Sequence, residues 1–191
     1  MSIGSIIFWA IVLLAAFYAI TIYNSLVALK HNVSRNLANI DVLLKQRHDE
    51  LPKLIETCKQ YMQYEQDTLE KVIKARSQVF DANAQHNMHD LGTAENLLRS
   101  SLGKLFALAE NYPDLKANQT FNNLQTRISS LENGIADRRE VYNESVNNNN
   151  VRIEQFPDTI IAKFFNFKAF ELLEFSAGEK ADIDVKQLFN S

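Results

Sequence analysis

The chain has 191 residues, which suits one ordinary domain with an anchor and is too short for two well-packed domains. Only 5 residues are glycine and 3 are proline, so few positions favour tight turns, and long helices are predicted. The net charge of −3 argues against the basic surface with which proteins bind nucleic acid. The single cysteine, Cys58, cannot form an internal disulfide or a multi-cysteine zinc site. No cofactor is therefore expected.

The N-terminal segment has the composition of a membrane anchor. Residues 1–29 contain no Asp, Glu, Lys or Arg, and the run from Ile3 to Ile22 is apolar except for Gly4, Ser5 and Thr21. About 20 apolar residues cross the core of a lipid bilayer. No basic residue precedes the run, unlike in a cleaved signal peptide, so residues 1–29 are predicted to be an uncleaved single-pass anchor. Lys30 and Arg35 follow the span, which places the rest of the chain in the cytoplasm and the N-terminus outside.

A heptad pattern begins after the anchor and predicts a first helix over residues 33–83 with a coiled-coil seam. The apolar side chains that follow steps of three and four are Leu37, Ile40, Leu44, Leu51, Leu54, Cys58, Tyr61, Val72 and Val79. The pattern keeps its phase on both sides of Pro52, so a kinked continuous helix is favoured over a new helix capped by Asp49.

Two charged residues, Arg47 and Glu65, fall on this seam. They are about 27 Å apart along a helix and cannot pair with each other, so each needs water or a partner on another helix, such as Arg138 or Glu132. A salt bridge or a snorkelling side chain at the edge of the core is favoured over a functional polar network.

The next two helices are predicted over residues 91–112 and 118–156. The polar stretch from Asp81 to Asp90 is predicted as the first turn between helices. His86, His89 and Asp90 within it give only a weak metal-binding signal, and a solvated loop is favoured. The later helix carries Asn149 on its seam, where a buried asparagine lowers stability but can fix register and partner number.

Aromatic residues are concentrated near the C-terminus, where 6 of the 12 phenylalanines lie between residues 156 and 175. Ile160, Ile161, Phe164 and Phe165 form a helical stripe after Pro157, which predicts a fourth helix that closes the bundle. The alternative is an exposed patch that contacts a partner chain or the bilayer surface. The predicted fold is all-α, with a transmembrane helix, a long antiparallel four-helix bundle over residues 30–175 and a flexible tail over residues 176–191.

Several segments together resemble the LemA family of bacterial membrane proteins. They include Tyr23-Asn24-Ser25-Leu26-Val27, residues 39–49, Lys74-Ala75-Arg76, residues 112–118 and Tyr142-Asn143. The resemblance covers about residues 23–175 and implies a single-pass protein of the bacterial inner membrane, with a long four-helix bundle and no established enzymatic activity. Some family members are associated with building or shaping intracellular membrane compartments. Gln46 and Asn149 depart from the family pattern, which has an arginine and a tyrosine there.

Three classes of function are consistent with these features. A scaffold that self-associates at the membrane is favoured, and an adaptor that docks another membrane or envelope protein is the alternative. An enzyme is disfavoured because the sequence has no nucleophile elbow, phosphate-binding loop or His-Glu-x-x-His motif. Cys58 lies on a packed seam, where an inert thiol is expected.

Self-association is predicted from the unequal lengths of the predicted helices. A bundle whose members differ in length leaves part of its apolar seams open to water unless another chain covers them. The expected contact between copies is Leu37, Ile40 and Leu44, with Phe164 and Phe165 as a second contact.

Overall fold

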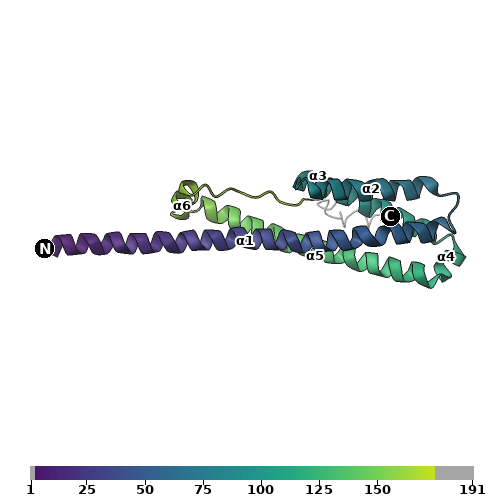
Figure 1. Ribbon diagram of the computed structural model, residues 1–191, viewed down its shortest axis with the longest axis horizontal. Coiled ribbons are helices and arrows are strands. Elements are labelled where there is room, and N and C mark those ends of the chain that lie inside the picture. The colour runs from purple at the N-terminus through teal and green to yellow at the C-terminus, as the bar shows by residue number, and fades with distance from the viewer. Residues whose placement is uncertain (1–2, 175–191) are drawn as a thin grey trace, which may run out of the picture. The chain divides into compact units, whose positions relative to one another are not determined.

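The structure is a computed structural model that describes residues 3–174, and its regular elements in that range are all helices (Figure 1). The six helices are α1 (Ile3–Lys59), α2 (Gln66–Ala84), α3 (Met88–Ala109), α4 (Pro113–Ala117), α5 (Gln119–Glu154) and α6 (Asp158–Phe164). The all-α prediction is confirmed. The predicted tail over residues 176–191, and Phe175 before it, lie outside the described residues.

The chain forms two compact units. The first unit is made of Met1–Ile40 and Arg138–Leu172, and the second of Asp41–Asp137 and Leu173–Ser191, as far as these ranges are described. Both units therefore draw on α1 and α5.

Helix α1 continues through Pro52, as predicted. Proline has no N–H, so the carbonyl oxygen of His48, four residues earlier, loses its usual helical donor. Arg76 of α2 replaces that donor, because its Nε lies 3.0 Å from the His48 oxygen and donates to it. A side chain from another helix thus satisfies the carbonyl that the proline leaves free.

The predicted first helix over residues 33–83 is wrong, because it breaks between Lys59 and Gln66. The amide N–H groups of Tyr61 and Met62 both donate to the Cys58 carbonyl, at 3.0 and 2.8 Å, and turn the chain. Met62 is fully buried by this turn. No glycine or proline marks the break, and the unbroken heptad phase across it favoured one helix.

Asparagine side chains begin the next two long helices. Asn87 accepts a hydrogen bond from the Asp90 amide at 3.0 Å, so α3 starts at Met88 and the predicted loop over residues 81–90 shrinks to residues 85–87. Asn118 accepts from the Phe121 amide at 3.1 Å at the start of α5. Its Nδ2 donates to the Tyr61 hydroxyl at 3.0 Å, which joins this cap to the α1–α2 turn.

The core of the second unit includes the predicted seam residues Leu51 and Leu54. The fully buried large side chains include Leu51, Leu54, Met62, Leu91, Leu98, Leu105, Leu115, Phe121 and Ile128. Helices α2 and α3 pack against each other. Burial of this much apolar surface is the main stabilising contribution in such a core.

The first unit has a smaller core. Ile22 and Leu26 of α1 pack against Ala162 of α6, with Ile153, Ile161 and Phe167 around them. The segment after α6 is irregular and is held by α5: Asn150 exchanges two hydrogen bonds with the backbone of Phe170, at 2.9 and 3.0 Å. The hydroxyl of Tyr142 donates to the Glu171 carbonyl at 2.9 Å.

The predicted role of the C-terminal aromatic stripe needs correction. Helix α6 has only seven residues and buries Ala162, whereas Phe164 is 80% exposed and Ile160 is 56% exposed. Phe156 just before it is 82% exposed. A helix this short, with its large side chains outward, does not close a bundle, and the alternative of an exposed patch agrees with these exposures.

Candidate functional site

The predicted apolar span is exposed over most of its length and becomes buried at Ile22. One helix within residues 3–174, α1, has a segment long and apolar enough to cross a membrane, with a mean hydropathy of 2.4 and none of that segment buried. Ile3, Leu13 and Phe17 are each about 70% exposed or more. Such a surface is unfavourable in water and suits lipid.

Arg47 lies at the centre of a buried ion cluster in the second unit. Its guanidinium is 1% exposed and donates from Nη2 to Oε1 of Glu95 on α3 and from Nη1 to Oε1 of Glu132 on α5. Burial disfavours the charged guanidinium, but the two carboxylates outweigh it and raise the pKa of Arg47. The cluster joins three helices.

The sequence anticipated this cluster in part. Glu132 is one of the two partners expected for the charged seam residues, whereas Arg138, the other, is exposed. Glu65 lies in the turn before α2, where its Oε1 accepts a hydrogen bond from the Tyr112 hydroxyl at 3.5 Å. Glu95 was missed, although strict steps of three and four from Leu91 reach it.

The sequence offered two other candidates for chemistry, the Cys58 thiol and the loop with His86, His89 and Asp90. Cys58 is fully buried, and this burial raises the pKa of its thiol to about 12, so little thiolate exists at neutral pH. His89 is 87% exposed, and Asp90 serves the helix cap. Within residues 3–174, no three His, Cys, Asp or Glu side chains are grouped closely enough to hold a metal ion.

A cavity of about 490 Å³ lies between α1 and α2 in the second unit. His48 and Phe80 stack within it, with ring centroids 4.9 Å apart, and Arg76 Nη2 lies 2.6 Å from His48 Nε2. Burial, and then the charge of Arg76, lower the pKa of His48. Burial raises the pKa of Asp41, which also lines the cavity, against the effects of Asn83 and His86.

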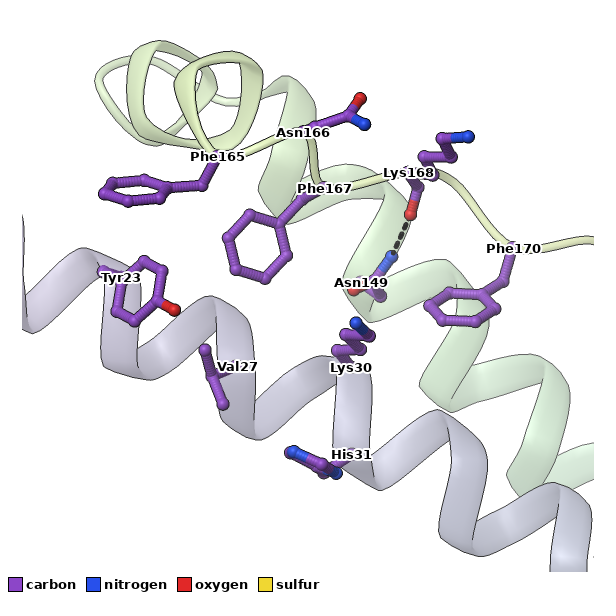
Figure 2. A pocket seen from close by; sticks show the side chains of 10 residues that line it. All are labelled: Tyr23, Val27, Lys30, His31, Asn149, Phe165, Asn166, Phe167, Lys168 and Phe170. Atoms are coloured by element: carbon purple, nitrogen blue, oxygen red, sulfur yellow. Dashed lines mark hydrogen bonds between the residues drawn. The ribbon is translucent and has the colours of Figure 1, made fainter.

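A larger cavity of about 610 Å³ lies in the first unit, between α1, α5 and the segment after α6 (Figure 2). Its lining residues are Tyr23, Val27, Lys30, His31, Asn149, Phe165, Asn166, Phe167, Lys168 and Phe170. The ring of Tyr23 packs against Phe165 and Phe167, with centroids 4.6 and 5.8 Å apart. The cavity therefore combines aromatic walls with lysine side chains.

Two of the predicted site residues line this cavity. Asn149 is 1% exposed, and its Nδ2 donates to the Lys168 carbonyl at 3.4 Å, so it positions the segment after α6 and is not part of an exposed partner surface. Phe165 is half-exposed. The remaining lining residues were not anticipated, because they lie on segments far apart in the sequence.

The contact surface predicted for self-association near the anchor is largely closed. Ile40 is 0% exposed and Leu44 is 4% exposed, and Leu37 is half-buried. These side chains pack within the chain and are not free to contact another copy. Phe164 and Phe165, the second predicted contact, are exposed.

Comparison with known proteins identifies relatives. Magnetosome protein MamQ 2 of Paramagnetospirillum magneticum is 22% identical over 190 residues, which cover 87% of this chain and 70% of that protein. Protein LemA of Metamycoplasma hominis is 25% identical over 168 residues, which cover 87% of this chain and 75% of that protein. These relatives and the apolar N-terminal helix are consistent with association with a membrane. The model of the LemA family matches residues 36–187, and the chain belongs to this family.

Proposed function

We propose that the protein is a single-pass membrane scaffold that self-associates and thereby organises or shapes the membrane. The observation that carries this proposal is an exposed, charge-free apolar segment that continues, in the same helix, into two folded helical units. The raised pKa of the buried Cys58 thiol favours a structural role over an enzymatic one. Relatives named as magnetosome proteins support a role at a membrane.

We infer that the helices of the second unit act as an antiparallel four-helix bundle. Arg47 of α1 contacts both α3 and α5, and Arg76 of α2 binds α1. Contacts through charged, buried side chains define which helices pair, because a mismatched pairing would leave charges without partners. A folded helical unit held at the membrane is the property that a scaffold needs.

The surface proposed for self-association is the patch formed by Phe156, Ile160 and Phe164, all more than half exposed. In the first unit, α6 packs on Ile22 and Leu26 at the end of the apolar run. Copies whose spans lie side by side in one bilayer can bring these patches together. Anchoring in one plane also raises the effective concentration and favours contacts that are weak in solution.

Mass photometry of the full-length protein in mild detergent tests the proposal. We expect an oligomer at micromolar concentration, and loss of the oligomer in the variant Phe156→Ser/Ile160→Ser/Phe164→Ser. The control Val42→Ser/Leu97→Ser removes exposed apolar side chains elsewhere and should leave the oligomer intact. A monomeric wild type would reject self-association, and an oligomer that survives the triple substitution would reject the α6 surface.

The orientation and location are also part of the proposal. Lys30 and Arg35 after the span favour a cytoplasmic position for the folded units of a bacterial inner-membrane protein, with the N-terminus outside. In a Cys58→Ala background, a cysteine at the exposed position Gln63 should react with a membrane-impermeant maleimide only after the cells are permeabilised. Labelling of intact cells would reverse the orientation.

The adaptor function remains a second candidate, and the cavity at His48 favours it. Phe80 is 57% exposed beside this cavity, a combination that suits a side chain of another protein. A Phe80→Ser variant separates the two functions, because it should leave the mass of the purified oligomer unchanged but remove any second protein that co-purifies with the wild type.

A further inference from the structure

The cavity in Figure 2 has apolar walls and a cluster of basic side chains, and the proposed scaffold function does not explain this combination. Aromatic and aliphatic walls come from Tyr23, Val27, Phe165 and Phe167. The remaining lining includes Lys30, His31 and Lys168, and contains no Asp or Glu. A volume of about 610 Å³ lies within the range of small-molecule sites. The cavity therefore suits a ligand with an apolar part and a negative charge.

The two lysines are available to an anion. Within residues 3–174, neither Lys30 nor Lys168 forms an ion pair, and both are exposed. Figure 2 shows the Lys30 side chain extending from α1 toward the segment after α6, whereas the Lys168 side chain leaves that segment on its outer side. Lys30 is thus placed inside the cavity, with Lys168 at its rim.

The position of the cavity along α1 fits the boundary of a bilayer. Lys30 is the first charged residue after the apolar run that ends near Ile22. Tyr23 and Val27 lie one to two helical turns before Lys30, on the side of the span. An acyl chain against these two side chains would leave its phosphate near Lys30.

We propose that this cavity binds one anionic phospholipid, with the phosphate held by Lys30 and with Lys168 at the rim of the site. The glycerol and the first acyl carbons lie against Tyr23, Val27 and Phe167. The structure is well suited to hold such a lipid, because Asn149 fixes the Lys168 backbone to α5. The proposal rests on the proposed membrane anchoring and is independent of self-association.

Native mass spectrometry of the full-length protein, released from mild detergent, tests it. The probes are phosphatidylglycerol, phosphatidylcholine with the same acyl chains, and glycerol phosphate as a soluble source of the same anion. We expect saturable binding of one phosphatidylglycerol per chain, at least about tenfold tighter than phosphatidylcholine, as expected for charge-assisted contacts. Glycerol phosphate should compete weakly, because it lacks the apolar part.

Two cavity variants distinguish a specific lipid site from a general attraction of anionic lipid to basic residues. Lys30→Gln/Lys168→Gln should weaken phosphatidylglycerol binding about tenfold or more, whereas Lys71→Gln/Lys163→Gln, with the same change of charge at exposed positions outside the cavity, should not change it. Val27→Trp fills the cavity without changing the charge and should also abolish binding.

Equal binding of the two lipids, or binding unaffected by either cavity variant, would overturn the proposal. Competition by glycerol phosphate at the same concentration as the lipid would assign the site to a soluble phosphate instead. The same spectra report the number of protein chains separately from the number of lipids, so a failure of the lipid site is distinguishable from a failure of self-association.

Discussion

We expect the hydrogen bond from Arg76 to the His48 carbonyl to stabilise the protein only while Pro52 is present. In the wild type, Arg76 Nε donates to the His48 carbonyl oxygen at 3.0 Å. When Pro52 is kept, Arg76→Ala leaves that oxygen without a donor. An unsatisfied polar group in a partly buried position costs roughly 1–3 kcal/mol. With Pro52→Ala, the new amide at position 52 can donate to the same oxygen, so Arg76→Ala should cost less.

The expected coupling free energy between Pro52→Ala and Arg76→Ala is about 1–2 kcal/mol. Loss of the packing of the long Arg76 side chain occurs in both backgrounds and cancels in the double-mutant cycle. Urea unfolding of the four full-length proteins in the same detergent, followed by far-ultraviolet circular dichroism, gives the four free energies of unfolding. A coupling below about 0.5 kcal/mol would refute the compensation between the two residues.

The same contact has a pH dependence. Arg76 Nη2 lies 2.6 Å from His48 Nε2, which accepts only when the imidazole is neutral, and burial lowers the pKa of His48. As the pH falls, His48 takes up a proton in the unfolded chain before it does so in the folded protein. The contribution of neutral His48 to the free energy of unfolding is therefore complete above its ordinary pKa of 6.5 and is lost as the pH falls through its lower pKa in the folded protein. The raised pKa of Asp41 changes the free energy of unfolding with pH in the opposite direction. The difference between the wild type and His48→Gln at each pH isolates the contribution of His48, because Asp41 is present in both proteins.

Two further predictions concern other parts of the second unit. Arg47→Ala should lower the free energy of unfolding by about 3–5 kcal/mol, because the buried Glu95 carboxylate loses the guanidinium charge that it pairs with, and a melting temperature that falls by only a degree or so would reject a buried cluster. Gly92→Ala should destabilise the protein, because a Cβ there would lie 2.0 Å from the Glu174 carbonyl oxygen. Gly103→Ala in the same helix meets nothing within 4 Å and should stabilise by about 0.5–1 kcal/mol in the same unfolding assay; equal effects of the two substitutions would contradict the close approach.

The seams could be predicted from the sequence because burial follows the three-four spacing. Ile40, Leu51 and Leu54 are all 0% exposed on the predicted stripe. The break between Lys59 and Gln66 could not be predicted, because the heptad phase continues across it and no proline or glycine marks it. The Tyr61 amide donates to the Cys58 carbonyl within the turn, and Nδ2 of Asn118, which is distant in the sequence, donates to the Tyr61 hydroxyl.

The cavity in the first unit could not be predicted from the sequence for a similar reason. Tyr23 and Phe167 are far apart in the chain and meet because Asn149 and Asn150 hold the segment after α6 against α5. From the sequence, Asn149 is expected only to lower stability and to fix register and partner number. Hydrogen bonds from Asn149 and Asn150 to backbone groups of Lys168 and Phe170 give both asparagines a structural role.

Cross-linking in intact membranes tests the central proposal of self-association most directly. In a Cys58→Ala background, single cysteines would replace Ile160, exposed on α6, and Ile40, fully buried. A bismaleimide at native protein abundance should join copies through position 160 and not through position 40. Absence of cross-linked copies at position 160, with the cysteine shown to be reactive, would contradict a scaffold that assembles through this surface.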